Sequence, residues 1–147
     1  MKTELQLRPA NMNDADCLLA WRNDRATREA SLCTARVEVA DHIKWLRSAI
    51  SNDQQRLYIA EVNHRAVGSI RADREGECWI LSWTVAPRSR GKGIAQQMLK
   101  CFIEGCNETL LAQIKVNNIA SQKVAVRAGF VLQDVQDGIF FYQRNAD

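Results

Sequence analysis

The chain has 147 residues, of which 46% are hydrophobic and 25% are charged, and its formal net charge is +3. A chain of this length is expected to form one domain over residues 1–147, with a single core that buries roughly two thirds of the unfolded surface. This average composition excludes a disordered chain, a fibrous repeat and a disulfide scaffold. The small positive charge is too dispersed to indicate nucleic-acid binding.

No segment has the pattern of a membrane helix or a signal peptide. The longest mainly apolar run, residues 78–87, is interrupted by Ser82 and Thr84 and is shorter than the roughly 18 to 20 residues that a bilayer requires. The N-terminus lacks an apolar core, so we expect a cytoplasmic protein without a membrane partner. The five cysteines are odd in number and lack CxxC spacing, so we expect free thiols and no metal site.

The N-terminal part is predicted to begin with a strand and to continue with helices. Leu5 and Leu7 alternate with polar neighbours over residues 3–8, as in a half-buried strand. Apolar residues then recur at helical spacing. This period predicts three helices, over residues 13–22, 25–31 and 38–50.

The rest of the chain changes period twice. Its predicted strands are 56–62, 66–73, 78–85, 109–116, 131–135 and 139–144, and its predicted helices are 94–106 and 121–130. The dipeptide Asp137-Gly138 is favourable for the turn of the last hairpin. This order predicts an α/β (α+β) sandwich with a mixed sheet, and it excludes a doubly wound dinucleotide fold because βαβ units do not repeat.

A turn rich in glycine and basic residues lies between the strand that ends near residue 85 and the helix that begins near residue 94. Gly91 and Gly93 lack Cβ atoms, so backbone N–H groups can approach an anion there, and the helix N-terminus adds unpaired donors. The turn carries three cations, Arg88, Arg90 and Lys92. These features favour a diphosphate ligand, although neither the GxxxxGK[ST] nor the GxGxxG pattern is present.

This turn resembles the acetyl-coenzyme A (acetyl-CoA) loop of the Gcn5-related N-acetyltransferases (GNAT family). Its pattern of Arg or Gln, two residues, Gly, one residue, then Gly or Ala is filled by Arg90, Gly93 and Ala95. A second family feature is matched by Asn118, Ser121 and the dipeptide Gly129-Phe130. The resemblance implies the GNAT fold, a mostly antiparallel sheet of about seven strands with about four or five helices. It also implies that two strands splay apart to form the acetyl-CoA cleft.

The implied activity is direct transfer of the acetyl group from acetyl-CoA to a primary amine within a ternary complex, without a metal. The pantetheine arm would pair with backbone between the splayed strands, and a backbone N–H there would stabilise the oxyanion. Much of the rate would come from positioning the two substrates. The cofactor-binding residues that the resemblance implies are Trp83, Val85, Arg90, Gly91, Lys92, Gly93, Ile94, Ala95 and Asn118.

The N-terminal half resembles, within this family, the N-acetyltransferases of the pseudaminic-acid pathway type, which modify an amino sugar on a nucleotide carrier. The implied substrate-binding residues are Trp21, Arg22, Asn23, Arg28, His42, Trp45 and Arg71. The basic side chains among them can meet phosphates, and a tryptophan can stack on a ring. The same residues are also compatible with core packing and helix capping.

Other acceptors and another class of function stay open. The chain loosely resembles acetyltransferases of peptide or ribosomal-protein N-termini, and a non-catalytic acetyl-CoA-binding module is the alternative outside enzymes. Polyamines and aminoglycosides are disfavoured because the acceptor half is rich in arginine. A homodimer is compatible with the resemblance.

The catalytic acid and base of many relatives are missing. Ala125 stands where relatives carry a tyrosine that protonates the leaving thiolate, and Trp79 stands where some carry a glutamate as general base. Glu77, two residues earlier and on the same predicted strand face, is the first candidate base. Other candidates within the meander are Glu61, Asp73 and Ser82. Tyr142, on the last predicted strand, is the candidate acid.

Overall fold

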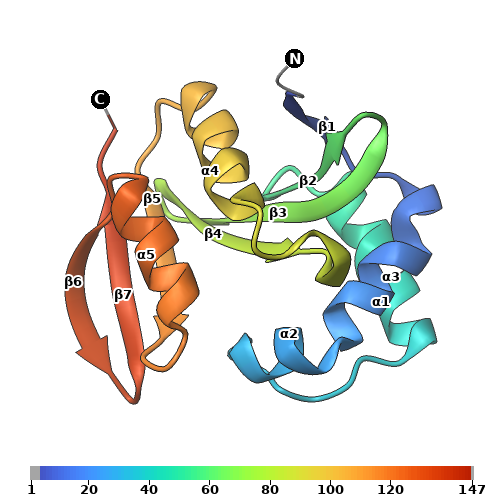
Figure 1. Ribbon diagram of the computed structural model, residues 1–147, viewed down its shortest axis with the longest axis horizontal. Coiled ribbons are helices and arrows are strands. Elements are labelled where there is room, and N and C mark those ends of the chain that lie inside the picture. Colours follow the sequence, from blue (N-terminus) through green and yellow to red (C-terminus); the bar gives the residue numbers. More distant parts are fainter. Residues whose placement is uncertain (1–3, 147) are drawn as a thin grey trace.

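A computed structural model describes residues 4–146 of the protein (Figure 1). Thr3, the first residue of the predicted N-terminal strand, lies outside the described residues. The described chain forms a seven-stranded sheet with the order β1-β2-β3-β4-β5-β7-β6. Its strands are β1 (Leu5–Pro9), β2 (Gln55–Val62), β3 (Arg65–Glu75), β4 (Cys78–Val85), β5 (Leu110–Lys115), β6 (Val131–Gln136) and β7 (Ile139–Arg144). Only the β4–β5 pair is parallel, which confirms the predicted mostly antiparallel sheet.

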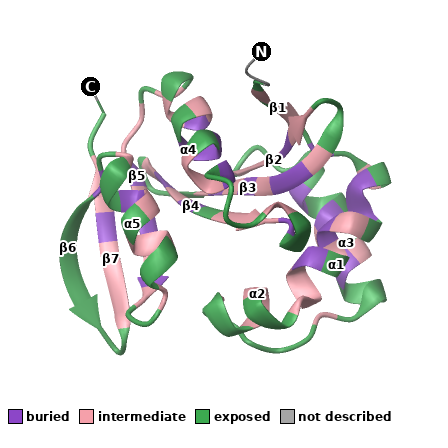
Figure 2. Ribbon diagram, viewed as in Figure 1, coloured by how far each residue is buried: buried purple, intermediate pink, exposed green. Residues whose placement is uncertain are grey.

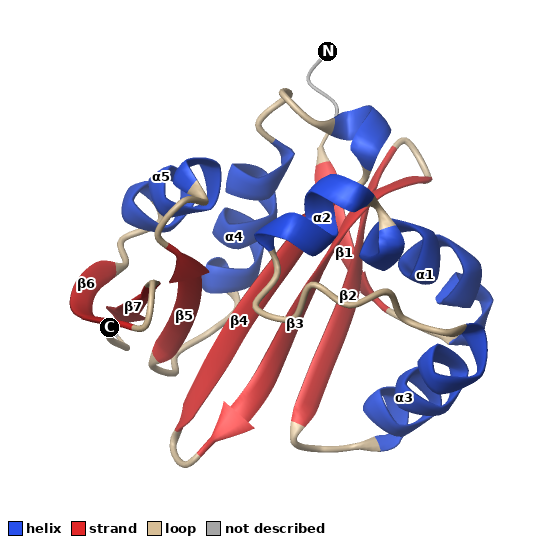
Figure 3. Ribbon diagram, turned by 90° about the horizontal axis from the view of Figure 1, so that it is seen from below, coloured by secondary structure: helices blue, strands red, loops and turns tan. Residues whose placement is uncertain are grey.

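Helices cover both faces of this sheet (Figure 3). They are α1 (Ala15–Asn23), α2 (Arg25–Ala30), α3 (Val39–Ser51), α4 (Ile94–Glu104) and α5 (Ile119–Arg127). α4 and α5 bury Leu99, Phe102 and Ala125 in the larger core cluster with β3, β4 and β5. α1 and α3 bury Leu18 and Leu46 in a second cluster with β2. The predicted fold class is therefore confirmed.

Local capping explains where α5 begins. The predicted helix started at Ser121, whereas α5 starts at Ile119. Asn118 is the N-cap, and its side-chain oxygen accepts a hydrogen bond from the backbone N–H of Ser121 at 3.2 Å. Such a cap satisfies one of the N–H groups that the first turn of a helix leaves unpaired.

The parallel pair β4–β5 is short, and the two strands separate beyond it. Their paired residues are Trp79 with Leu110, Ile80 with Leu111, and Leu81 with Ala112. β4 runs on to Val85 while pairing only with β3, and β5 runs on to Lys115 while pairing only with β7. The sheet thus splits between β4 and β5, as the family resemblance implied.

Burial is uneven within the C-terminal part of the sheet, β5–β7–β6 (Figure 2). β6, at one edge of the sheet, is exposed along its whole length, whereas β5 buries alternate residues. All five cysteines are free thiols. No described helix has the length and apolar character needed to span a bilayer.

Candidate active site

The β4–α4 turn has the backbone geometry of an anion cradle. After β4 the chain makes a short 3-10 turn at Pro87–Ser89 and then passes through Gly91 and Gly93, whose φ angles are +77° and +74°. A Cβ atom on either glycine would meet no atom within 4 Å, so the space beside the turn is open. Gly93 is the N-cap of α4, and no side chain caps this helix. The first N–H groups of α4 are therefore available to a ligand.

The three cations of this turn do not share one role. Arg88 and Lys92 are exposed and have no hydrogen-bond or ion-pair partner among the described residues. Arg90 instead donates to Asp24 Oδ2 at 2.6 Å and to Thr27 Oγ1 at 3.0 Å. The Arg90 guanidinium is the main cause that lowers the pKa of the Asp24 carboxyl. Arg90 therefore connects the turn to the start of α2, and Arg88 and Lys92 stay free to face an anion.

The remaining predicted cofactor residues border the split. The backbone of Trp83 and Val85 pairs with β3 but has no partner on the β5 side, and their side chains pack against the α4 cluster. Ile94 is buried and anchors the start of α4, with Ala95 packed beside it. Asn118 lies beyond the end of β5, on the opposite side of the split.

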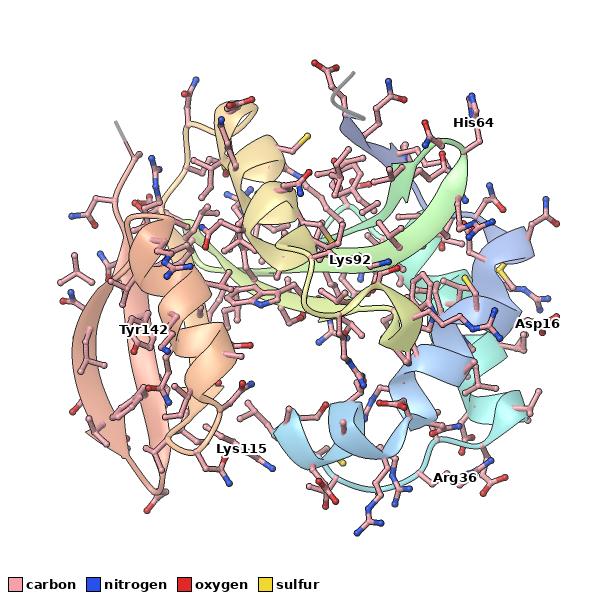
Figure 4. The ribbon with its side chains drawn as sticks, viewed as in Figure 1. Asp16, Arg36, His64, Lys92, Lys115 and Tyr142 are labelled. Atoms are coloured by element: carbon pink, nitrogen blue, oxygen red, sulfur yellow. The ribbon has the colours of Figure 1, made fainter. Side chains whose placement is uncertain are left out.

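Helix α2 is connected to both sides of the split. Arg90 reaches its first turn from the β4–α4 turn, and Lys115, the last residue of β5, donates from Nζ to the backbone oxygen of Glu29 at 2.8 Å. Figure 4 shows Lys115 directed toward α2. The hydrogen bonds of Arg90 and Lys115 therefore hold α2 against both sides of the split.

Five of the seven predicted substrate-binding residues line a pocket of about 360 Å³, which we call the inner pocket. They are Trp21, Arg22, His42, Trp45 and Arg71. Ser82 and Thr84 of β4 also line it, so the inner pocket lies beside the part of β4 that borders the split. Ser82 and Thr84 are not among the predicted substrate-binding residues. Their alternation along the predicted strand could have indicated them, because residues two positions apart lie on one face of a strand.

The two arginines of the inner pocket differ in their partners. Arg22 donates from Nη2 to the Cys33 backbone oxygen at 2.8 Å, but its Nη1 is buried without a hydrogen-bond partner among the described residues. Arg71 donates from Nε to Asp73 Oδ2 at 2.9 Å, and its guanidinium lies 5.6 Å from the Trp45 ring centroid. A buried N–H without a partner is costly, so Arg22 offers a donor to an anionic or carbonyl group of a ligand.

His42 lies in the wall of the inner pocket, as predicted for a substrate-binding residue, but in a buried position. It is 3% exposed, and its Nε2 lies 3.1 Å from the Ala15 backbone oxygen. Burial lowers its pKa, because desolvation disfavours the charged imidazolium. The side chain therefore supplies no positive charge at neutral pH.

Asn23 and Arg28 do not line the inner pocket, although Asn23 lines a larger hollow on the α1 side of the β4–α4 turn. The Asn23 amide donates to the Val37 backbone oxygen at 2.8 Å and accepts from the Val37 N–H at 2.7 Å. Arg28 donates from Nε to the Thr34 backbone oxygen at 3.2 Å. Both residues hold the segment between α2 and α3, a role that no local pattern indicates because the partners are distant backbone groups.

The two candidate catalytic residues lie in different surroundings. Glu77 is exposed in the turn between β3 and β4, so six residues of strand, about 20 Å, separate it from Trp83. This position argues against the expected role of Glu77 as general base. Tyr142 is 6% exposed and belongs to the core cluster that contains Ala125. Figure 4 shows it between β7 and α5.

Comparisons with known proteins agree with this arrangement. The chain is similar to spermidine N-acetyltransferase from Vibrio cholerae in complex with CoA and spermine, with a TM-score of 0.85, 14% identity, and coverage of 96% of this chain and 95% of that chain. It is also similar to an acetyl transferase from Salmonella typhimurium that modifies the N-terminal serine of a 50S ribosomal subunit protein (TM-score 0.82, 20% identity, coverage 99% and 97%). A third similar structure is aminoglycoside acetyltransferase AAC(6')-Ib with coenzyme A and kanamycin (TM-score 0.82, 18% identity, coverage 97% and 95%).

These structural similarities, at 14–20% identity, establish the fold. No curated protein sequence matches the chain. The model of the acetyltransferase (GNAT) domain family matches residues 4–131, a range that includes the β4–α4 turn, the split and Asn118. The chain therefore belongs to the GNAT acetyltransferase family.

Proposed function

We propose that this N-acetyltransferase transfers the acetyl group of acetyl-CoA to the amine of a sugar that is linked to a nucleotide. The observation that carries the acceptor class is the inner pocket. It combines the rings of Trp21 and Trp45 with the guanidinium groups of Arg22 and Arg71. Aromatic rings stack on the face of a sugar or a base, and guanidinium groups donate hydrogen bonds to phosphate or carboxylate oxygens.

The β4–α4 turn and the split fit the shape and charge of acetyl-CoA. The N–H groups at the start of α4 would donate hydrogen bonds to the diphosphate oxygens, with Arg88 and Lys92 beside them. The unpaired backbone edge at residues 83–85 would pair with the pantetheine arm. Asn118 would reach the same ligand with its side-chain NH₂, since its side-chain oxygen caps α5. CoA in the Vibrio cholerae relative supports this proposal.

The reaction needs little from the protein beyond position and electrostatics. The unprotonated amine attacks the thioester carbonyl carbon and forms the C–N bond, the C–S bond breaks, and the nitrogen loses one proton to solvent. The sulfur leaves as a thiolate that takes a proton. A backbone N–H on the free edge of β4 would stabilise the oxyanion. Tyr142 is the proposed proton donor. A phenol is protonated at neutral pH at its ordinary pKa of about 10, and burial raises the pKa of Tyr142 further.

The charge of the inner pocket disfavours binding of a polyamine. Among the described residues, the charged side chains that line the inner pocket are Arg22, Arg71 and Asp41. Two guanidinium groups against one carboxylate repel a polycation, whereas they attract an acceptor that carries phosphate.

A panel of acceptors tests the proposal. The purified protein is mixed with acetyl-CoA and with nucleotide-linked amino sugars, the free amino sugars, a peptide with N-terminal serine, or spermidine. Because Cys33 is an exposed thiol, the acetylated product is followed by mass spectrometry and not by thiol release. We expect turnover to be fastest with a nucleotide-linked sugar. Turnover confined to the peptide or spermidine would overturn the acceptor class, and acetyl-CoA binding without turnover would overturn catalysis.

A further inference from the structure

A second hollow lies beside the inner pocket, on the α1 side of the β4–α4 turn. This outer groove has a volume of about 1470 Å³ and lies between α1, the β2–β3 hairpin and the β4–α4 turn. It is lined by four cations, Arg36, Arg65, Arg88 and Lys92. In Figure 4, Lys92 lies at the β4–α4 turn and Arg36 lies on the segment between α2 and α3. The groove is therefore bordered by several separate segments of the chain.

The charge of the outer groove is not neutralised within the described chain. All four cations are exposed, and none has a hydrogen-bond or ion-pair partner among the described residues. The groove has two carboxylates, Asp16 and Asp24, and Asp24 is already paired with Arg90. The cations come from three segments that are distant in the sequence. Arg88 and Lys92 are placed beside the diphosphate of acetyl-CoA, which leaves Arg36 and Arg65 to face a second anion. Cations that outnumber the carboxylates of one hollow raise the local concentration of an anion there.

The outer groove is continuous in the fold with the inner pocket. Trp21 lines both hollows. On the sheet, the Ser69–Thr84 pair lines the inner pocket, and Val67 and Ala86, joined by a 2.8 Å backbone hydrogen bond, line the outer groove. These pairs are two residues apart along the strands, which is about 7 Å and comparable with the span of one hexose ring.

We infer that the outer groove binds the nucleoside diphosphate of the acceptor while the sugar and its amine lie in the inner pocket. The inference rests on the proposed acceptor class. It replaces Arg28 and His42, which were expected to meet the phosphates, with Arg36 and Arg65. Arg36 and Arg65 lie outside the β4–α4 turn, so their role is separable from acetyl-CoA binding.

Two single variants and one control test the inference. Arg65→Ser and Arg36→Ser each remove one exposed cation of the groove. Arg127→Ser, the control, removes one exposed cation without a described partner from the end of α5. We expect Arg65→Ser and Arg36→Ser to raise KM for a nucleotide-linked amino sugar by roughly tenfold, the equivalent of one lost charge-assisted hydrogen bond of about 1.4 kcal/mol. KM for acetyl-CoA and KM for the free amino sugar should not change, and Arg127→Ser should change none of them.

The outcomes separate this inference from the proposed function. Equal increases in KM for acetyl-CoA and the acceptor would assign the groove to the cofactor and overturn the inference. An unchanged KM for the nucleotide-linked acceptor in both variants would also overturn the inference. Turnover of that acceptor by the same variants would still support the proposed function. Uridine diphosphate serves as a direct probe by calorimetry in the presence of saturating coenzyme A. Binding that Arg65→Ser weakens about tenfold, without turnover of any sugar, would uphold the inference and overturn the proposed function.

Discussion

Gly93 has a backbone conformation that few residues with a side chain adopt. Its φ of +74° is in the left-handed region, where glycine is favoured and asparagine is tolerated. The open space beside its Cα shows that sterics with the protein do not require glycine there. The requirement is the conformation itself, together with the ligand that we place against this turn.

Two substitutions of Gly93 separate conformation from charge. Gly93→Asn keeps a residue that tolerates positive φ, whereas Gly93→Glu adds a negative charge where the diphosphate of acetyl-CoA is proposed to lie. We expect Gly93→Glu to weaken acetyl-CoA binding by at least roughly tenfold, and Gly93→Asn to weaken it much less. Titration calorimetry measures both. Equal affinities of Gly93→Glu and the natural protein would refute the cradle.

Tyr142 lies in the same buried cluster as Ala125, the position where relatives carry their tyrosine. A buried phenol with a raised pKa holds its proton at neutral pH. Tyr142→Phe is therefore expected to lower kcat by roughly 100-fold, the usual contribution of a general acid, with KM for both substrates unchanged. An unchanged kcat, with stability close to that of the natural protein, would leave Tyr142 as a core residue only.

Helix α2 is too short to be stable alone, since isolated helices of this length are marginal in water. It buries no residue, and polar contacts hold it to the rest of the chain. Asp24 caps α2 through the Thr27 N–H and also accepts from Arg90. The helix can therefore be loosened without disturbing the core.

The Asp24→Asn substitution tests this view of α2. Asparagine still offers an N-cap oxygen, but it loses the ion pair with Arg90. Because Asp24 and Arg90 are 25% and 40% exposed, we expect the free energy of unfolding to fall by no more than about 1 kcal/mol. Amide hydrogen exchange in α2 should nevertheless become faster, while exchange in α3 stays the same. Uniform acceleration in both helices would show that the pair supports the whole domain.

Much of the arrangement of helices and strands could be predicted from the chain, because apolar periods and turn residues are local signals. The three-strand meander and the turn at Gly91 and Gly93 are confirmed in this way, whereas the split after β4 was implied by the family resemblance and not by these local signals. Side-chain partners across the fold could not be predicted in this way. Arg90 appeared to be a phosphate ligand, and its ion pair with Asp24 depends on a contact between residues 66 positions apart. The contacts of Asn23 with Val37 and of Arg28 with Thr34 could not be predicted for the same reason.

The stability of the complete domain depends on a charged group near the N-terminus. Asp14 is 6% exposed and accepts from the two terminal nitrogens of Arg8 at 2.9 and 2.7 Å, and from the Asn11 N–H at 2.8 Å. Arg8 also pairs with Glu61 at 3.1 Å. This network joins β1, β2 and the start of α1. The hydrogen bonds from Arg8 are the main cause that lowers the pKa of Asp14 below its usual 3.8.

The pH dependence of stability follows from this shift. A carboxyl with a lowered pKa in the folded state stabilises the fold above its unfolded pKa, and this contribution is lost as pH falls through the folded pKa. Asp14→Asn is expected to lower the free energy of unfolding by about 2 kcal/mol at neutral pH. The difference from the natural protein should shrink as pH falls below 3.8. Urea unfolding at several pH values measures it, and a difference that is independent of pH would contradict the assignment.

The split in the sheet has a mechanical consequence for the protein. Three residue pairs are the whole backbone connection between the unit β1–β4 and the unit β5–β7–β6 within the described sheet. A small rotation about so short a seam changes the width of the mouth between Val85 and Lys115 more than it changes the spacing at Leu81. A ligand that contacts both β4 and β5 beyond the paired residues would fix the distance between the two strands. The thickness of the pantetheine arm, and not the sheet alone, would then set the angle between the two halves of the molecule.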